Sequence, residues 1–476
     1  MLRDRYDPMN LFAYIPTLSM QMEPVLTQLD TLLDDDVLFQ AVKTDLLKRY
    51  PHTASEGRPS TPVEVILRLL VVKHLYGWSF PQTTQFVSDS LVLRQFCRVY
   101  VAPVPDQSTL NRWAQLIQPA TLHRLLDHLV HLACQLQVTQ GRKLRLDGTV
   151  VETNIHHPTD STLLNDGVRV LSRTLSKAKS LLRNGTTLPQ EVFTDCTQQA
   201  REQMKRIMEV ARQRGEEAVE GLKTTYRALL HLTTTVVARA QQVQAVLVEQ
   251  APTRADQVVA KIAQYVPRVE QIITQTTRRV LQGEQVPAHE KLVSLFEPHT
   301  AIIRKGKPGK PTEFGRVLWL DEVDGGLISR YAVLTGNPDE KAQLPPSVDH
   351  HLQQFGHPPE LLTGDRGVHS ARNERYARAT GITEVVLPKP GRKSAKRIAY
   401  EQQVWFQAGR NWRAGIEGRI SGLKRQYRLD RCRYHGDAGM ERWVGLGLIV
   451  HDLRVIAQHL VVSQGIRRCG HRTASC

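Results

Sequence analysis

Hydrophobic residues recur at helical spacing through residues 1–138. A helix is predicted to begin at Thr61-Pro62-Val63-Glu64, because Thr61 is a good N-cap, proline suits the first helical turn and Glu64 completes a capping box. A second helix is predicted from Ser79 to Phe96, a third from Asp106 and a fourth over residues 121–138. Short helices joined by tight turns are compatible with a helix-turn-helix-like DNA-binding unit. A unit that only supports a core or an oligomer is the alternative.

The pattern changes from helical to strand-like at Lys143. Leu144, Leu146, Val150 and Val151 follow the alternation of a half-buried strand. Residues 168–296 return to helical spacing, with Gln, Arg, Glu and Thr between the apolar positions. This stretch predicts a helical insert that acts as a structural arm or a packing surface.

Strands and helices then alternate toward the C-terminal part of the chain. The turn Asp324-Gly325-Gly326 between two apolar runs indicates a β-hairpin. The later elements are predicted as a helix over 339–355, a strand over 361–364, a helix over 371–380, a strand over 382–387, and helices over 404–427 and 442–460. This order is typical of a mixed α/β fold.

Three acidic residues stand out against this framework. Asp147 ends the apolar run that begins at Lys143, Asp365 ends the run that begins at Leu361, and Glu417 lies in a predicted helix. A glycine-containing turn is predicted after each aspartate, which would leave its carboxylate unobstructed. Two strands and a helix can bring three carboxylates together around two divalent metal ions, and this arrangement catalyses in-line attack on phosphodiesters.

The surroundings of Glu417 carry a second signal. Gly415 and Gly418 flank it, and glycine in a helix costs about 1 kcal/mol relative to alanine, so the pair predicts a close approach to this helix face. Arg413 and Lys424 are predicted to share the face of Glu417 and to hold phosphates beside it. A solvated face of salt bridges is the alternative.

The charge balance indicates the kind of partner. The chain has 476 residues, enough for two or three domains, and its 63 Lys and Arg against 47 Asp and Glu give a net charge of +16. Such an excess favours a polyanion such as DNA, with solubility alone as the alternative. Two basic loops broken by Gly and Pro, residues 304–310 and 389–397, suit phosphate contacts.

Cysteine usage and apolar runs exclude several other classes. The six cysteines are scattered without a CxxC pair, so neither a disulfide framework nor a zinc finger is expected, and a reduced cytosolic setting fits. The polar start of the chain does not resemble a signal peptide. The apolar run from Val65 to Leu75 contains Arg68 and Lys73 and is short for a bilayer, so we expect a soluble protein without a membrane partner.

Taken together, the motifs resemble those of a DDE transposase of a bacterial insertion sequence. The matching segments are Leu146 to His156 with Pro158 to Ser161, Gly364-Asp-Arg-Gly367 with Asn373, and Arg413-xxx-Glu417-xxxxxx-Lys424. The last is similar to the Tyr-Arg-Glu-Lys signature of such transposases, except that Arg410 stands at the position of the tyrosine. The resemblance covers roughly residues 60–170 and 295–460, and no motif supports the insert between them.

The resemblance implies an enzyme that cuts and joins DNA. Asp147, Asp365 and Glu417 would be catalytic and would hold two Mg²⁺ (or Mn²⁺) ions. The residues expected to contact DNA are Arg413, Lys424, Arg366, Lys389, Arg392, Lys393, Lys396 and Arg397. The partners would be double-stranded DNA, as terminal inverted repeats and as target, and a second copy of the chain in a homodimer or larger assembly. The expected location is the bacterial cytoplasm, with the nucleoid.

The fold implied is α/β, with a ribonuclease H-like mixed-sheet catalytic domain. The expected division is a helical N-terminal DNA-binding domain over 1–138, the first part of the catalytic domain over 139–170, a helical insert over 171–296, the rest of the catalytic domain over 297–462 and a basic tail over 463–476. Three alternatives remain open. One is an inactive, transposase-derived DNA-binding protein, another is a metal-dependent nuclease that only hydrolyses, and the third is a regulator that uses only the N-terminal helices.

Overall fold

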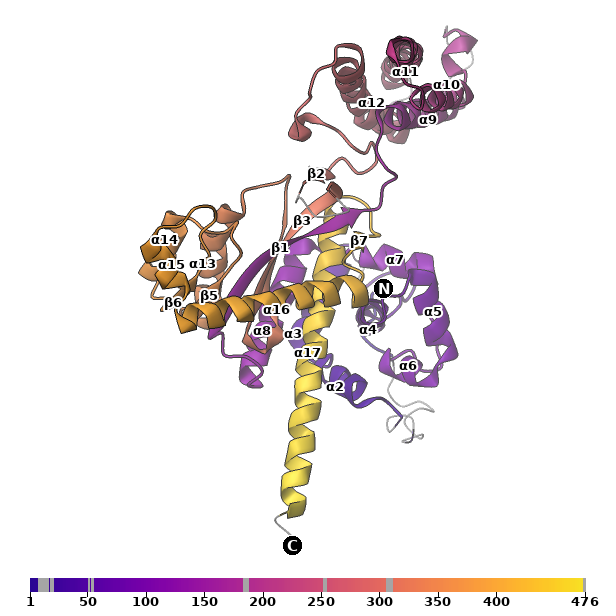
Figure 1. Cartoon of the computed structure of the whole chain (residues 1–476). Coiled ribbons are helices and arrows are strands. Elements are labelled where there is room, and N and C mark those ends of the chain that lie inside the picture. The colour runs from indigo at the N-terminus through magenta and orange to yellow at the C-terminus, as the bar shows by residue number, and fades with distance from the viewer. Residues whose placement is uncertain are drawn as a thin grey trace. The chain divides into compact units, whose positions relative to one another are not determined.

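The chain forms two compact units (Figure 1). The computed structural model describes residues 1–6, 17, 21–49, 52, 55–182, 188–250, 255–304 and 311–473. The discontinuous unit combines Met1–Thr153 with Arg316–Cys476, and the middle unit is Asn154–Gly315. Each unit has its own hydrophobic core. The basic segment 305–310, one of the two loops predicted to contact phosphates, lies outside the described residues.

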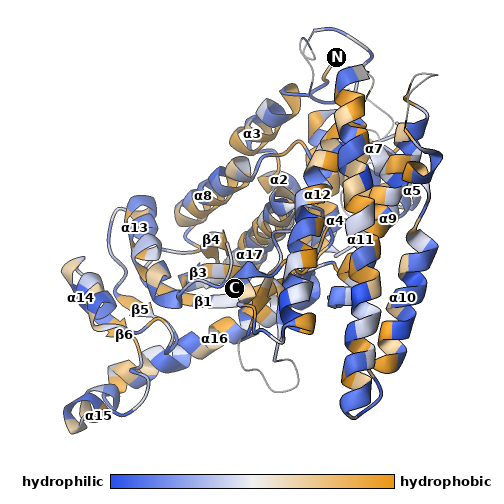
Figure 2. Cartoon of the chain, turned by 90° about the horizontal axis from the view of Figure 1, so that it is seen from above, coloured by the Kyte–Doolittle hydropathy of each residue, from blue (hydrophilic) through white to orange (hydrophobic). Residues whose placement is uncertain are grey.

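The middle unit is built mainly from long helices whose hydrophobic faces pack together (Figure 2). Leu164, Leu229, Val243 and Ile262 are fully buried in its core. The first helix begins at Asp160, earlier than the predicted helical stretch 168–296, and the later helices lie within that stretch. Its elements are α9 (Asp160–Lys179), η2 (Gln190–Phe193), α10 (Thr197–Val210), α11 (Glu216–Gln250), α12 (Asp256–Thr276), the π-helical turn η3 (Thr277–Leu281), η4 (Ala288–Glu290) and β2 (Ala301–Ile303).

A mixed sheet forms the centre of the discontinuous unit, so the α/β prediction is confirmed. The strand order in this unit is β3-β1-β5-β6, with β4 on β3 and β7 on β1, and β2 pairs with Glu313–Gly315, the part of β3 that belongs to the middle unit. The strands are β1 (Lys143–Thr153), β3 (Glu313–Val323), β4 (Ile328–Leu334), β5 (Leu361–Thr363), β6 (Glu384–Val386) and β7 (Arg431–Cys432). β3 and β4 are antiparallel and joined by η5 (Asp324–Gly326), which confirms the predicted hairpin, whereas β5 and β7 run parallel to β1.

The strand that carries Asp147 runs without a turn through Val150 and Val151, the two valines of its predicted alternation. β1 continues through Gly148 to Thr153, so the turn expected after Asp147 is wrong and the residue lies within the strand. The reason is the run Thr149-Val150-Val151, because β-branched residues favour strands and the two valines are fully buried. Beyond Asp147 the strand gains a parallel partner, since Glu152 pairs with Arg431 of β7.

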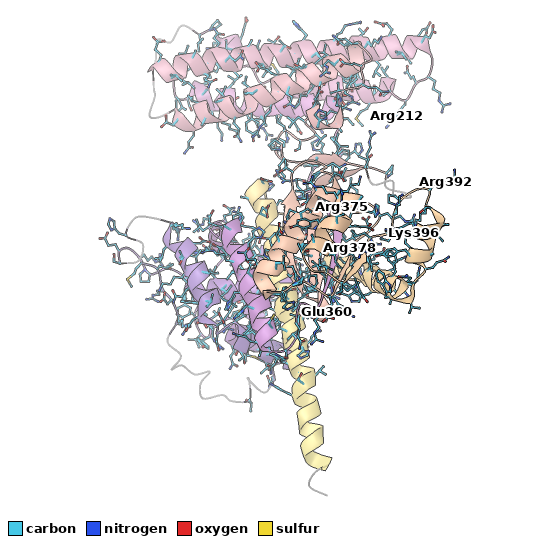
Figure 3. All side chains as sticks on the ribbon, turned by 90° about the vertical axis from the view of Figure 1, so that its left-hand side faces the viewer. Arg212, Glu360, Arg375, Arg378, Arg392 and Lys396 are labelled. Atoms are coloured by element: carbon cyan, nitrogen blue, oxygen red, sulfur yellow. The ribbon has the colours of Figure 1, made fainter. Side chains whose placement is uncertain are left out.

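The C-terminal half of the discontinuous unit adds helices around the sheet. They are η6 (Glu340–Gln343), α13 (Leu344–Phe355), α14 (Ala371–Ala379), α15 (Ala395–Glu401), α16 (Val404–Gln426) and α17 (Asp437–Thr473). α16 packs against β1, β5 and β6. Gly409 permits the close approach, because a Cβ there would lie 2.7 Å from a methyl carbon of Val386. Arg375 and Arg378 project from α14 (Figure 3).

α17 is the longest helix described. It extends to Thr473, into the segment 463–476 expected as a basic tail. Its stretch Asp437–Gln464 is long and apolar enough to cross a membrane by length and composition, and 67% of the apolar window is buried within the structure. Burial of this kind is what a core helix requires: α17 packs against α8, α4 and β4.

The first 138 residues contribute seven described helices: α2 (Pro24–Leu32), α3 (Asp36–Leu47), α4 (Val63–Leu75), α5 (Phe80–Asp89), α6 (Leu91–Phe96), α7 (Gln107–Ala114) and α8 (Pro119–Gln135). Two details of the prediction are wrong. The N-cap of α4 is Pro62 and not Thr61, and proline has no side-chain acceptor; Glu64 forms no capping box, because its side chain accepts from Arg68 at 3.3 Å instead. The helix expected from Ser79 to Phe96 breaks at Ser90, whose hydroxyl caps α6 by accepting from the Leu93 N–H.

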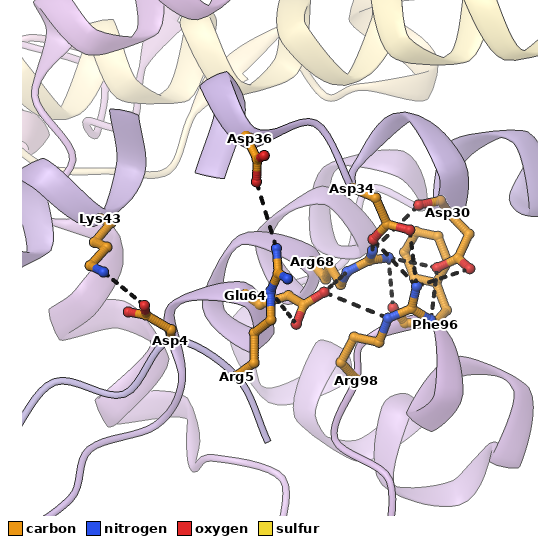
Figure 4. A network of polar contacts seen from close by, with 10 residues as sticks. All are labelled: Asp4, Arg5, Asp30, Asp34, Asp36, Lys43, Glu64, Arg68, Phe96 and Arg98. Atoms are coloured by element: carbon orange, nitrogen blue, oxygen red, sulfur yellow. Dashed lines mark hydrogen bonds and ion pairs between the residues drawn. The ribbon is translucent and has the colours of Figure 1, made fainter. Parts of the chain in front are cut away.

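Buried charges join these helices (Figure 4). The Arg68 guanidinium is fully buried. It contacts Asp30 Oδ1 in α2 at 2.7 Å and Asp34 Oδ1, just after α2, at 2.6 Å. Arg98 reaches the same two acids. A buried cation needs such partners, since a lone charge in the core costs several kcal/mol. The network therefore fixes α4 to α2 and to the end of α6.

Candidate active site

Asp147 is held by contacts from its own strand and from α16. Its Oδ1 accepts a hydrogen bond from the Gly148 N–H at 2.8 Å, and its Oδ2 accepts one from Arg413 Nη2 at 3.3 Å. The side chain is 14% exposed. A carboxylate with these restraints is rigid and only partly solvated, which suits a metal ligand or a catalytic group.

Asp365 lies two residues beyond the end of β5. Its Oδ1 accepts the N–H groups of Gly367 at 2.8 Å and Val368 at 3.1 Å, so the predicted glycine-containing turn is present here. The Glu340 carboxylate lies close to Gly367, so a side chain at this position would have to displace it. Both hydrogen bonds use Oδ1, which leaves Oδ2 for another ligand.

The strand register places the two aspartates at corresponding positions along neighbouring strands. β1 and β5 are parallel, with Arg145 opposite Thr363, and each aspartate follows its paired residue by two positions. Asp147 lies within β1, whereas Asp365 lies in the turn after the last paired residue of β5. Because neighbouring strands lie about 4.8 Å apart, both residues belong to the same end of this strand pair.

Glu417, on α16, is linked to Asp147 through Arg413. Its side chain is 70% exposed, and Arg413, one turn earlier, lies with Nη1 at 3.7 Å from Glu417 Oε1. Since the same guanidinium also contacts Asp147, Arg413 bridges the strand carboxylate and the helix carboxylate. Lys424 is half-buried further along α16.

The donor set fits a hard divalent cation, because Mg²⁺ prefers carboxylate oxygens. In the part of the chain that the structure describes, no three His, Cys, Asp or Glu side chains are grouped closely enough to hold a metal ion. Arg413 instead supplies the positive charge between Asp147 and Glu417. The exposed Glu417 side chain is free of packing constraints and can change rotamer to complete the set.

A buried polar network fixes α16 beside β1. Arg145 of β1 donates to both carboxylate oxygens of Glu322 on β3, at 2.9 and 2.5 Å, and to the Trp412 carbonyl of α16 at 2.5 Å. Arg419 of α16 donates to the same Glu322 at 3.2 Å. Glu322 is fully buried. One carboxylate thus joins the strand and the helix that carry Asp147 and Glu417.

The network continues to α17. Arg419 Nη1 lies 3.2 Å from His451 Nε2, and His451 Nδ1 lies 2.7 Å from Asp452 Oδ1. Burial raises the pKa of Asp452, although the hydrogen bond to His451 lowers it. Asp452 also accepts the Ile328 N–H at 3.1 Å. Neither Glu322 nor this chain was expected from the sequence, where Glu322 was one residue of an apolar strand.

The glycines beside Glu417 differ in what surrounds them. A Cβ on Gly415 would lie 2.5 Å from Arg145 Nη1, whereas a Cβ on Gly418 would have nothing within 4 Å. The predicted close approach is therefore confirmed for Gly415, and its cause is Arg145. Both glycines line an open cavity of about 400 Å³ that also touches Arg425 and His451, so the difference between them is the contact of Gly415 with Arg145.

This difference gives opposite expectations for two alanine substitutions. Gly418→Ala should raise the free energy of unfolding by about 1 kcal/mol through helix propensity. Gly415→Ala gains the same propensity but displaces Arg145, which costs about 1–3 kcal/mol, so a net loss is expected. Urea unfolding of both variants measures the difference. Equal stabilisation by the two alanines would contradict the packing role of Gly415.

The basic residues after Asp365 fall into two groups. Arg366, Lys389, Arg392 and Lys396 are exposed. Lys393 and Arg397 instead form ion pairs with Glu401, at 2.5 and 2.7 Å, and tie the loop to α15. Burial raises the pKa of Glu401, but hydrogen bonds from Lys393, Arg397 and the Lys389 N–H outweigh it and lower this pKa to about 2.

Two arginines of α14 add to these exposed basic residues. Arg375 and Arg378 of α14 point outward on the same part of the unit as Arg392 and Lys396 (Figure 3). The sequence contains a signal for them, because Arg372, Arg375 and Arg378 recur every third residue and so share one helix face. The prediction from the sequence included the basic loop 389–397 but not this face of α14.

Comparisons with known proteins match two parts of the chain to transposase domains. A family model described as "Transposase domain (DUF772)" matches residues 18–116, and one described as "Transposase DDE domain" matches residues 322–453. The second range begins at Glu322 and contains Asp365 and Glu417. The class of the protein is thus a transposase with a DDE domain. The two matches support a DDE transposase of an insertion sequence, as the motifs predicted.

One curated relative is similar over a limited part of the chain. It is the "Uncharacterized protein ORF8 in nfe locus" of Rhizobium meliloti, 29% identical over 138 residues, which cover 28% of this chain and 66% of the relative. No solved structure matches the chain significantly.

Proposed function

We propose that this transposase binds the terminal inverted repeats of its own insertion sequence and catalyses metal-dependent DNA cleavage and strand transfer. The proposal is supported by the parallel register of β1 and β5, in which Asp147 and Asp365 each follow a paired residue by two positions, together with Arg413, which contacts both Asp147 and Glu417. The ribonuclease H-like classification of the sheet belongs to the same proposal. The mixed strand order and the adjacent parallel strands β1 and β5 support it.

Each side chain has a defined task in this proposal. Asp147, Asp365 and Glu417 hold two divalent ions, Mg²⁺ or Mn²⁺, which when bound activate the attacking oxygen and stabilise the leaving oxygen. Rigid strands hold the two aspartates in place, and the Arg145–Glu322–Arg419 network orients α16. Arg413 and Lys424 bind phosphates near the scissile bond.

The chemistry proceeds by two displacements at phosphorus. Water attacks the phosphodiester at the element's end, breaks a P–O bond and leaves a 3′-hydroxyl. That 3′-oxygen then attacks a phosphodiester of the target DNA, forms a new P–O bond and releases a target 3′-hydroxyl. The exposed cations Arg366, Arg375, Arg378, Arg392 and Lys396 support a DNA path beside the site.

The remaining parts of the proposal concern assembly. The helices of residues 1–138 recognise the repeats, and two ends are paired by a homodimer or larger complex. The protein acts in the bacterial cytoplasm at the nucleoid.

The proposal is tested by cleavage and joining of DNA that carries the gene's own flanking sequence, with Mg²⁺ and with EDTA. Glu417→Gln should lower both activities on the order of 10³-fold, since several kcal/mol of transition-state stabilisation are lost. Glu360→Gln is a matched control, because its side chain is 68% exposed, close to the 70% of Glu417, and it lies at the start of β5.

The outcomes separate the candidate functions. Metal-dependent nicking and joined products that are lost only in Glu417→Gln support the transposase. Nicking without joined products favours a hydrolytic nuclease. Specific binding to the repeat ends without cutting, in any metal, favours an inactive DNA-binding derivative and would leave the carboxylates without a catalytic role.

A further inference from the structure

The middle unit contains a cavity of about 560 Å³ that the proposed catalysis does not use. Three cations line it: Arg279 from η3, Lys291 after η4 and Arg304 after β2. Val286 and Ile302 form an apolar part of the cavity wall. The cations come from three separate segments that the fold brings to one place.

The lining carries more positive than negative charge. Its one acid, Glu284, accepts both hydrogen bonds of a bidentate pair from Arg278, at 2.8 and 2.6 Å. Arg279 forms an ion pair with Asp160: Asp160 Oδ2 lies 2.7 Å from Arg279 Nη1, and the Asp160 side chain is only 6% exposed. A buried carboxylate that holds an arginine in place is a supporting element of the kind that ligand sites use.

The backbone at this cavity is also unusual. Thr277–Leu281 is a π-helical turn at the end of α12, and such turns are rare and frequent at functional sites. The wide turn carries both Arg278, which holds Glu284, and Arg279, which lines the cavity. A regular α-helical turn would place these two side chains differently.

The cations lie close enough to affect one another. Burial lowers the pKa of Lys291, and the charges of Arg279 and Arg304 lower it further, while Asp160 opposes them. Repulsion among like charges in a partly desolvated cavity is relieved by a bound anion.

We propose that this cavity is a binding site for a phosphate group. Guanidinium groups pair with phosphate oxygens in a planar, bidentate manner, and a lysine adds a point charge, so two arginines and a lysine around a polar cavity match this ligand. A backbone phosphate of DNA and a free phosphate or nucleotide present the same chemistry. The site is independent of the proposed catalysis, because every lining residue belongs to Asn154–Gly315 and the three candidate catalytic carboxylates do not.

The first test uses inorganic phosphate and the full-length protein without metal. Binding is followed by isothermal titration calorimetry for the wild type, Lys291→Met, Arg304→Gln and the control Arg212→Gln, which removes the same charge from an exposed position of the middle unit (Figure 3). We expect the dissociation constant to rise at least tenfold in both cavity variants and to stay unchanged in the control. Circular dichroism confirms that each variant is folded.

Two results would overturn the site: no phosphate binding by the wild type, or equal binding by wild type and folded cavity variants. Neither result bears on cleavage, and loss of cleavage in Glu417→Gln does not bear on phosphate binding. The two proposals therefore fail separately.

The second test identifies the source of the phosphate. If the site takes a DNA backbone phosphate, a duplex displaces inorganic phosphate, and Lys291→Met lowers the slope of log K against log salt by about one. If it takes a free phosphate or nucleotide, the duplex leaves phosphate binding unchanged and the salt slope is that of the wild type. Both results support a phosphate site and differ only in its occupant.

Discussion

Glu322→Gln is expected to lower the free energy of unfolding by about 3–5 kcal/mol, because it removes the shared acid from a buried group of charges. Arg145 is only 9% exposed at its side chain, and its bidentate partner is Glu322. Arg419 of α16 loses the same partner. An amide keeps the shape but not the charge, so the buried Arg145 guanidinium would lose its counter-charge, and Arg419, whose side chain is 30% exposed, would lose an ion pair. The loss is measured by urea unfolding.

The same substitution should lower DNA cleavage by about 10²-fold or more in protein that is still folded. The reason is geometric: α16 carries Arg413 and Glu417, and a misplacement of about 1 Å at a catalytic group can cost this much. Glu64→Gln is the matched control, because Glu64 is a buried acid that pairs with Arg68 in the N-terminal helices (Figure 4). It should lose stability while retaining cleavage per folded molecule. Equal cleavage by both variants would remove the positioning role of Glu322.

Lys73→Met is expected to stabilise the protein by about 2–4 kcal/mol at pH 6–7. Lys73 is 2% exposed and lies among the rings of Phe80, Tyr434 and Trp443, at 4.9, 5.1 and 4.7 Å. Burial lowers its pKa from the usual lysine value of 10.5 to about 7, with a contribution from Arg433. The aromatic faces attract the cation but do not replace its lost hydration.

The direction of the pH effect follows from this pKa. The unfolded chain keeps the proton up to about pH 10.5, whereas the folded protein releases it near pH 7. Between these values the unfolded state binds more protons, so the wild type becomes more stable as pH rises. Below pH 7 both states are protonated and the full cost of the buried charge remains. The advantage of Lys73→Met should therefore be largest below pH 7 and shrink toward pH 10.

Thermal unfolding between pH 6 and pH 10 measures this trend. Lys205→Met on the exposed face of α10 is the control, because it makes the same substitution at a solvent-exposed position. A difference between Lys73→Met and wild type that does not change with pH would show that Lys73 keeps an ordinary pKa in the folded protein.

The sequence alone determined the local structure and the chemical types. Apolar spacing predicted α16 within one residue of its observed end, and the Asp324-Gly325-Gly326 turn predicted the hairpin, because both depend on neighbouring residues. The motifs around Asp147, Asp365 and Glu417 identified the family. The assignment of these three residues to catalysis, and of the basic residues to DNA, remains a prediction.

The tertiary structure decided where these groups meet. The length of β1 depended on a partner strand, β7, that follows in the sequence only after α16. Likewise, the register that places Asp147 and Asp365 at corresponding positions comes from pairing between distant segments. Glu322 and Lys73 could not be distinguished from ordinary strand and helix residues, because their role arises from burial and from partners far away along the chain. Local propensity is set by adjacent residues, whereas burial, register and ion pairing are set by contacts that only the folded chain creates.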